Sequence, residues 1–236
     1  MTSAVAKRRE RERAERRDQI LDAARDVFWR EGFEAATMGD IAEAAQLGKG
    51  TLYLYFRDKD HLALGLAVRH QGELLQTMEQ HQAEAEATSA SGRELLRKHL
   101  NSYADHMQEP IEHLRMVMSR WATGTPFDPA SEGCQRSRRN VARVFGLLRD
   151  AVSQAQREGE LTRELTAEQL TSFFVSSLNG CLLMKLQLSC LSPPSPVTDA
   201  VITSEQHLDL LLDACRHLGG PRPSHVGAHQ LEDAGQ

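Results

Sequence analysis

The segment from Thr37 to Lys59, TMGDIAEAAQLGKGTLYLYFRDK, constrains the fold of this chain more than any other. Thr37 is a good N-cap, and Asp40 three residues later completes a capping-box-like start, so we expect a short helix to begin here. Gly48 interrupts the helical pattern and supplies the backbone freedom that a tight turn needs. A second short helix is expected over residues 49–56. The segment therefore predicts two helices joined by a tight turn.

The outward face of the second helix contributes little to folding. Leu52 and Phe56 are four residues apart and are expected to point inward. The other side chains are small or aromatic, and basic residues flank them. Such a helix can enter the major groove of DNA while the flanking bases hold phosphates. A helical hairpin that only belongs to a core is the alternative, and spacing alone leaves both interpretations open.

A family resemblance favours the DNA interpretation. Residues 20–59 resemble the N-terminal domain of the TetR family of bacterial transcriptional repressors, and the resemblance is carried by ILDAARDVFWREGFEAATMGDIAEAAQLGKGTLYLYFRDKDHL. Its most specific part is GKGTLYLYFRDK. Most members have a small hydroxylated residue where this chain has Gly48, and often a histidine near Leu54, and these departures affect base preference. The resemblance covers less than a quarter of the chain, and the remainder agrees only in helical character and length.

The resemblance implies a ligand-responsive regulator, most simply a repressor. Such a protein binds a palindromic operator in double-stranded DNA as a homodimer and releases it when a small molecule, here unknown, binds the C-terminal domain. A helical dimeric adaptor without specific DNA binding is the alternative, and a helical enzyme is a further one. We predict base contacts from the second helix and phosphate contacts around it, by Thr37, Lys49, Gly50, Thr51, Tyr53, Leu54, Tyr55 and Lys59.

Composition predicts an all-α fold, and the helical segments along the chain number about nine. Ala, Leu, Glu, Arg and Gln abound while β-branched residues are sparse. We expect a basic arm over 1–17, a helix-turn-helix domain over 18–60, a helical ligand-binding and dimerisation domain over 61–218 and a disordered tail over 219–236. The arm is either disordered or a frayed extension of a first helix that starts near Asp18. Its seven basic and three acidic residues form a solvated charge run or meet DNA.

Several other classes of function find little support. The net charge is −5, so attraction to DNA must be local. The four cysteines form no CxxC pair, which argues against a zinc site and favours reduced thiols in a cytoplasmic protein. We expect no membrane span, no cofactor, no metal and no catalytic site. His99, His106 and His113 recur every seven residues, but Pro110 interrupts their face, so we expect solvated or pocket-edge histidines.

Two sets of apolar residues in the C-terminal part are functional candidates. The helix expected over 166–188 is apolar on more than one side, so one side can face its own subunit and the other a partner. A pair of core helices in a monomer is the alternative. We predict a dimer seam at Phe174, Leu178, Cys181, Leu182, Leu208 and Leu212. Large adaptable side chains suggest ligand contacts, although each can equally fill a core: Tyr103, Met107, Met118, Trp121 and Phe145.

Overall fold

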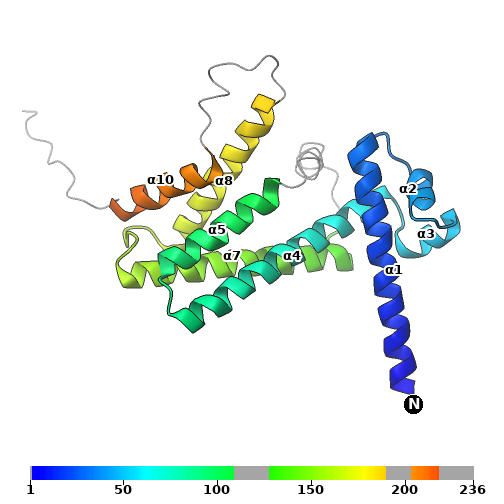
Figure 1. The fold of residues 1–236 in the computed structure, drawn as a ribbon, viewed down its shortest axis with the longest axis horizontal. Coiled ribbons are helices and arrows are strands. Elements are labelled where there is room, and N and C mark those ends of the chain that lie inside the picture. The colour runs from blue at the N-terminus through cyan, green and yellow to red at the C-terminus, as the bar shows by residue number, and fades with distance from the viewer. Residues whose placement is uncertain (1, 109–127, 190–202, 218–236) are drawn as a thin grey trace, which may run out of the picture.

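The protein is all-α, as expected (Figure 1). The computed structural model describes residues 2–108, 128–189 and 203–217, and these ranges contain eight helices and no strand. Their bounds are α1 Thr2–Glu31, α2 Met38–Ala44, α3 Lys49–Tyr55, α4 Lys59–Thr88, α5 Gly92–Gln108, α7 Glu132–Glu158, α8 Ala167–Ser189 and α10 Ser204–His217. Within the described ranges, no helix is both long and apolar enough to span a membrane.

A first hydrophobic cluster holds α1, α2, α3 and the start of α4 together. The buried face of α1 repeats every three or four residues, and it meets the single buried faces of α2 and α3. The cluster includes Ile20, Val27, Ile41, Leu52, Phe56 and Leu62. It also includes Leu66, inside α4 and beyond the domain boundary predicted at residue 60, so this core crosses that position. The boundary itself stays a prediction.

The start of α2 has the predicted capping box. The Thr37 hydroxyl accepts hydrogen bonds from the backbone N–H groups of Gly39 and Asp40, both at 3.2 Å. The Asp40 carboxylate in return accepts from the Thr37 backbone N–H at 2.9 Å and from its hydroxyl at 2.6 Å. These bonds hold the pKa of Asp40 below its usual value. The turn between α2 and α3 therefore starts from a rigid first helix.

The turn itself differs from the expectation. The left-handed residue is Gln46, with φ 54°, whereas Gly48 has φ −66°, a conformation open to any residue. Leu47 donates its N–H to the Ala42 carbonyl at 2.8 Å, which closes the end of α2 in a Schellman-like arrangement. Gly48 instead serves as the N-cap of α3. The backbone conformation at position 48 therefore does not require a glycine.

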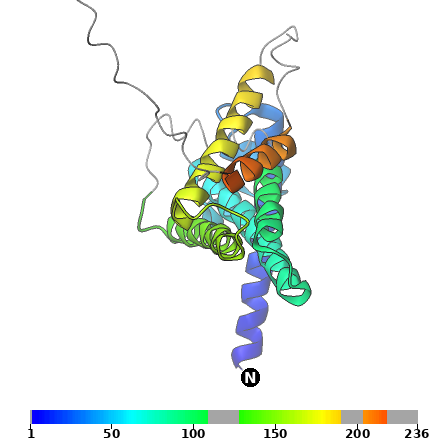
Figure 2. The same cartoon turned by 90° about the vertical axis from the view of Figure 1, so that its left-hand side faces the viewer.

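A second hydrophobic cluster joins α4, α5, α7, α8 and α10. α4 and α5 form an antiparallel pair, and α7 packs extensively against both. α8 and α10 lie together at the end far from α1–α3 (Figures 1 and 2). Two helix boundaries in this cluster follow local rules. Gly159, with φ 78°, ends α7, and Thr166 with Gln169 forms a capping box at the start of α8.

The basic N-terminal segment is helical and continuous with α1, which begins at Thr2 rather than near Asp18. Its first half projects beyond the rest of the molecule in both views (Figures 1 and 2). Two of its arginines pair along the helix: Arg8 with Glu12 at 2.7 Å and Arg11 with Glu15 at 3.4 Å. These i,i+4 pairs explain why a charge-rich segment continues the helix.

Candidate DNA-binding interface

Helix α3 presents an outward face suited to contact a groove of DNA. Leu52 and Phe56 are buried in the first cluster, as expected. Tyr53 is 52% exposed and Leu54 75% exposed, unusually high for large apolar side chains. Lys49, Gly50 and Thr51 are exposed as well, while Tyr55 packs partly against the core. The outward orientation thus agrees with five of the six proposed base-contacting residues, and their role in DNA binding stays a prediction.

The start of α2 and the start of α3 converge at Gly39. A Cβ atom built at Gly39 would lie 3.0 Å from both Cε and Nζ of Lys49. The Lys49 ammonium therefore lies over the first turn of α2, beside the Thr37 cap. An exposed lysine ammonium at this position can pair with a phosphate of the DNA backbone. Sequence spacing gave no indication that Gly39 makes room for this lysine.

Lys59 has a structural role, which corrects its prediction as a phosphate contact. Its Nζ donates to the carbonyl oxygens of Phe33 at 2.6 Å, Glu34 at 3.0 Å and Ala36 at 3.0 Å. These three bonds use every N–H that an ammonium has. Nζ also lies 4.8 Å from the centroid of the Phe33 ring. Lys59 thus fixes the α1–α2 loop, and that explains a cation at the start of α4.

Replacing Lys59 by methionine is expected to lower stability and leave the salt dependence of DNA binding unchanged. Losing charge-assisted bonds to three carbonyls should cost about 2–3 kcal/mol. If Lys59 instead held a phosphate, the slope of log K against log salt would fall by about 0.9. Arg57→Met is the matched comparison, because the Arg57 side chain is 83% exposed. Thermal melts and salt titrations of both variants decide between the two roles.

The residues proposed to bind a ligand do not all face one core. Tyr103 is buried and donates from its hydroxyl to Asn179 Oδ1 at 3.0 Å, and Met107 packs against the same second cluster. Phe145 of α7 is 37% exposed, whereas its neighbour Val144 is buried. This placement does not support Phe145 as a residue that lines a buried ligand site. Met118 and Trp121 lie outside the described residues.

The residues predicted for the dimer seam lie on the sides of α8 and α10 that face the core of their own protomer. All of them except Cys181 are buried within the protomer itself: Phe174, Leu178, Leu182, Leu208 and Leu212. Cys181 is half-buried. A partner could not reach the buried side chains without unfolding the subunit. The sequence correctly indicated an apolar helix, but periodicity could not say which of its two apolar sides faced inward.

The opposite side of α8 remains exposed. It carries the residues that we call the α8 outer face: Phe173, Ser176, Gly180, Leu183 and Met184. Met184 is 54% exposed, and a Cβ atom at Gly180 would meet no atom within 4 Å. On α10, Leu210 is 62% exposed. Small residues between larger apolar ones let another helix approach closely. Exposed apolar residues scattered singly over a surface would not line up along one side of a helix in this way.

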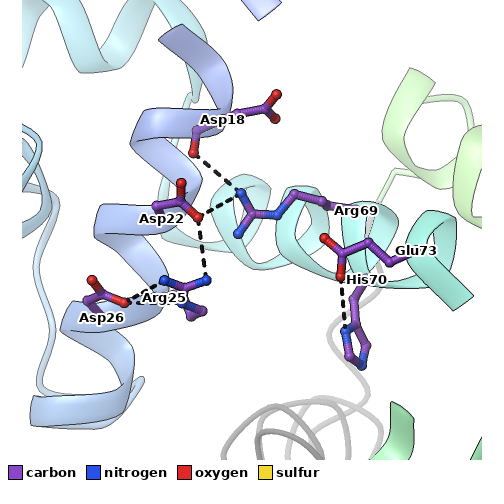
Figure 3. Close-up of polar contacts among 7 residues, drawn as sticks. All are labelled: Asp18, Asp22, Arg25, Asp26, Arg69, His70 and Glu73. Atoms are coloured by element: carbon purple, nitrogen blue, oxygen red, sulfur yellow. Dashed lines mark hydrogen bonds and ion pairs between the residues drawn. The ribbon is translucent and has the colours of Figure 1, made fainter. Parts of the chain in front are cut away.

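Two consecutive residues of α4 connect the two clusters. Arg69 reaches α1, with Nη1 3.0 Å from Asp22 Oδ1 and 3.4 Å from the Asp18 carbonyl oxygen (Figure 3). His70, the next residue, has Nε2 2.7 Å from the carbonyl oxygen of His106 on α5. One turn of α4 is therefore bound to α1 on one side and to α5 on the other. Arg69 and His70 thus link α1 to α5 through α4.

The fold and this interface define a helix-turn-helix domain followed by a larger helical domain. Residues 20–66 match the family described as "Bacterial regulatory proteins, tetR family". Residues 20–66 thus form a tetR-family DNA-binding domain, as the resemblance of residues 20–59 implied. The matched range also agrees with the first hydrophobic cluster, which extends to Leu66.

The curated relatives are named as regulators. The chain is 33% identical over 105 residues to the HTH-type transcriptional activator FasR of Mycolicibacterium smegmatis, covering 44% of this chain and 46% of the relative. It is 28% identical over 102 residues to the fatty acid metabolism regulator protein of Bacillus subtilis, covering 43% of this chain and 53% of the relative. The similarity therefore spans about half the length of each.

Solved structures extend the likeness over most of the chain. The fatty acid degradation regulator FadR from Bacillus halodurans superposes with a TM-score of 0.60 at 20% identity, covering 87% of this chain and 99% of that one. FadR from Bacillus subtilis in complex with stearoyl-CoA gives a TM-score of 0.58 at 18% identity, covering 82% and 96%. At these identities the likeness shows that the fold is shared.

Proposed function

We propose that this chain is a homodimeric transcriptional repressor that binds a palindromic operator and releases it when an effector binds the C-terminal domain. The observation that carries the proposal is the outward face of α3, where Tyr53 and Leu54 stand exposed on a helix fixed by Leu52 and Phe56. Thr37 and Lys49 beside it supply a place for the DNA backbone. An adaptor without specific DNA binding, or an enzyme, would not require exposed Tyr53 and Leu54 side chains on this short helix.

The proposed effector is a long-chain acyl-CoA. Relatives support this class, because one is named a fatty acid metabolism regulator and a protein of the same fold was solved with stearoyl-CoA. The second cluster, with Tyr103 and Met107 at one end, supplies the apolar surroundings that an acyl chain needs. Ligand binding between α4, α5 and α7 would move α4 against α1 through Arg69 and His70.

The experiment is a gel shift with the DNA upstream of the gene that encodes this chain. We expect a discrete complex with the purified full-length protein, and its dissociation on addition of stearoyl-CoA. Coenzyme A alone is the control ligand. No complex with any fragment of the upstream region would contradict the DNA-binding part. A complex that stearoyl-CoA leaves intact would contradict only the effector class.

The projecting half of α1 supplies a further part of the proposed DNA contact. Arg9, Arg13 and Arg16 follow at spacings of four and three residues, so they share one side of the helix. In the described part of the chain, none of the three has an ion-pair partner. Cζ of Arg17 instead lies 4.2 Å from the centroid of the Phe56 ring, and this contact holds α1 against the helix-turn-helix domain. The side chains of Arg9, Arg13 and Arg16 are therefore available to phosphates.

Replacing Arg9, Arg13 and Arg16 together by glutamine is expected to weaken binding to all DNA sequences alike. The slope of log K against log salt should fall by about 0.9 for each phosphate that the variant no longer neutralises. The matched control replaces Arg8 and Arg11, which already pair with Glu12 and Glu15, and it should change the slope less. Equal slopes for wild type and the triple variant would mean that the arm is a solvated charge run.

A further inference from the structure

His99 is a fully buried polar residue with no visible reason to be polar. It lies on α5 with 0% exposure, and neither ring nitrogen has a hydrogen-bond partner in the described part of the chain. An aromatic neighbour is His81 of α4, whose ring centroid is 6.0 Å away and whose Nδ1 is also buried with no partner among the described residues. Buried polar groups in native proteins are nearly always satisfied. This pair is therefore an exception that needs an explanation.

Apart from His81, the second cluster contributes apolar side chains from α4 and α5. The α5 residues on either side, Leu95, Leu96 and Leu100, are buried in the second cluster, and so is Met78 of α4. A polar pair further along α5 is Tyr103 with Asn179, and these two groups bond to each other at 3.0 Å. An apolar residue at position 99 would suit this core better than histidine in the absence of a ligand.

The buried imidazole is uncharged under physiological conditions. Burial lowers the pKa of His99 to about 4, and the neighbouring His81 contributes to the lowering. A neutral imidazole carries one N–H donor and one acceptor nitrogen. It can therefore donate to a neutral carbonyl oxygen, but it supplies no positive charge to balance a buried carboxylate. The chemistry favours an uncharged acceptor over a free acid.

We propose that His99, with His81 beside it, is the polar anchor of the effector site and donates a hydrogen bond to an uncharged carbonyl, such as the thioester carbonyl of a long-chain acyl-CoA. The apolar residues of the second cluster receive the acyl chain. This inference rests on the proposed function, which assigns an effector to this domain. It adds which residue selects the ligand and which atom of the ligand is selected.

If His99 is the anchor, the substitution His99→Leu should have opposite effects on the protein without effector and on the effector-bound protein. Without effector, the unsatisfied imidazole destabilises the core, so His99→Leu should raise Tm by about 2–5 °C. With effector, the same substitution removes the donor offered to the carbonyl. A residue that merely fills the core would show the reverse, since its replacement would lower Tm and leave ligand selectivity unchanged.

The test compares stearoyl-CoA with S-octadecyl-CoA, a thioether of the same length that lacks the carbonyl oxygen. Full-length wild type, His99→Leu and the control Met78→Leu are titrated with both ligands by calorimetry. Met78→Leu alters the same core without changing its polarity. We expect wild type to bind the thioester about tenfold more tightly than the thioether. Met78 belongs to the cluster that receives the acyl chain, so Met78→Leu changes the affinity for both ligands alike and keeps the wild-type ratio between them. His99→Leu should bind the two ligands equally.

The other possible results would overturn either the role of His99 or the proposed function. Equal affinity of wild type for the two ligands, no binding of either, or a lower Tm in His99→Leu would overturn the anchor. Operator binding by the same preparations is measured without ligand. Its absence in wild type would overturn the proposed function, while the ligand titrations would still decide the role of His99.

Discussion

Met184→Glu is expected to convert the dimer into a folded monomer that no longer binds its operator tightly. Met184 is 54% exposed in the protomer, so a glutamate there meets water and leaves the subunit's own core intact. In a two-fold dimer that pairs the α8 outer face with its copy, each substitution occurs twice. Two unpaired carboxylates in a desolvated seam should cost several kcal/mol, about 3–5 for each.

Leu178→Glu, on the inward side of the same helix, is expected to act differently. Leu178 is 0% exposed inside the second cluster, and this apolar core offers a carboxylate no compensating charge. Its cost of about 3–5 kcal/mol is a large part of a typical total stability of about 5–15 kcal/mol. We therefore expect loss of helical structure or insoluble protein from Leu178→Glu, rather than a soluble monomer.

Sedimentation velocity, circular dichroism and gel shift separate these outcomes. Val141→Glu is the matched control, because Val141 is 41% exposed on a different helix, α7. That variant should stay dimeric and bind DNA normally. A dimeric, operator-binding Met184→Glu protein would show that the subunits associate through another surface. Leu210→Glu on α10 extends the test to the second exposed helix.

Tyr53→Ala is expected to weaken operator binding by about 10- to 100-fold, or roughly 1–3 kcal/mol, with little change in stability. Tyr53 is half-exposed on α3 and lies outside the first cluster. Its neighbour Leu52 is fully buried, so Leu52→Ala should destabilise the protein by about 2–5 kcal/mol. The two variants separate a contact with DNA from support of the helix that makes it.

Both variants are compared by chemical denaturation and by fluorescence anisotropy with a labelled operator. Tyr53→Ala should keep the wild-type denaturation midpoint. Unchanged operator affinity in a correctly folded Tyr53→Ala protein would remove this side chain from the DNA interface. A large fall in its stability would instead make it part of the core.

Local rules predicted two helix starts and the buried side of α3 well. Thr37 with Asp40 and Thr166 with Gln169 are capping pairs three residues apart, so spacing alone identifies them. The inward positions of Leu52 and Phe56 follow equally from helical periodicity. The turn was less predictable, because a Gln46 in the left-handed region breaks the usual preference for glycine.

Contacts between distant residues could not be predicted in this way. Lys59 lies more than twenty residues from the three carbonyls that it binds, and only the folded loop brings them together. The two apolar sides of α8 look alike in sequence: Phe173 and Phe174 are adjacent residues of the same type, yet only Phe174 is buried. The burial of His99 likewise depends on packing of α4 against α5, which the heptad spacing of histidines does not specify.

The central claim is sequence-specific DNA binding by two copies of this chain. It is tested most directly by measuring affinity and stoichiometry for the upstream operator, a single half-site and a scrambled duplex at physiological salt. We predict two protomers on the full operator, bound at least about 10³-fold more tightly than the scrambled duplex. The half-site should be bound far more weakly than the full operator. Equal affinity for all three duplexes would mean charge-driven, non-specific binding and would contradict the account.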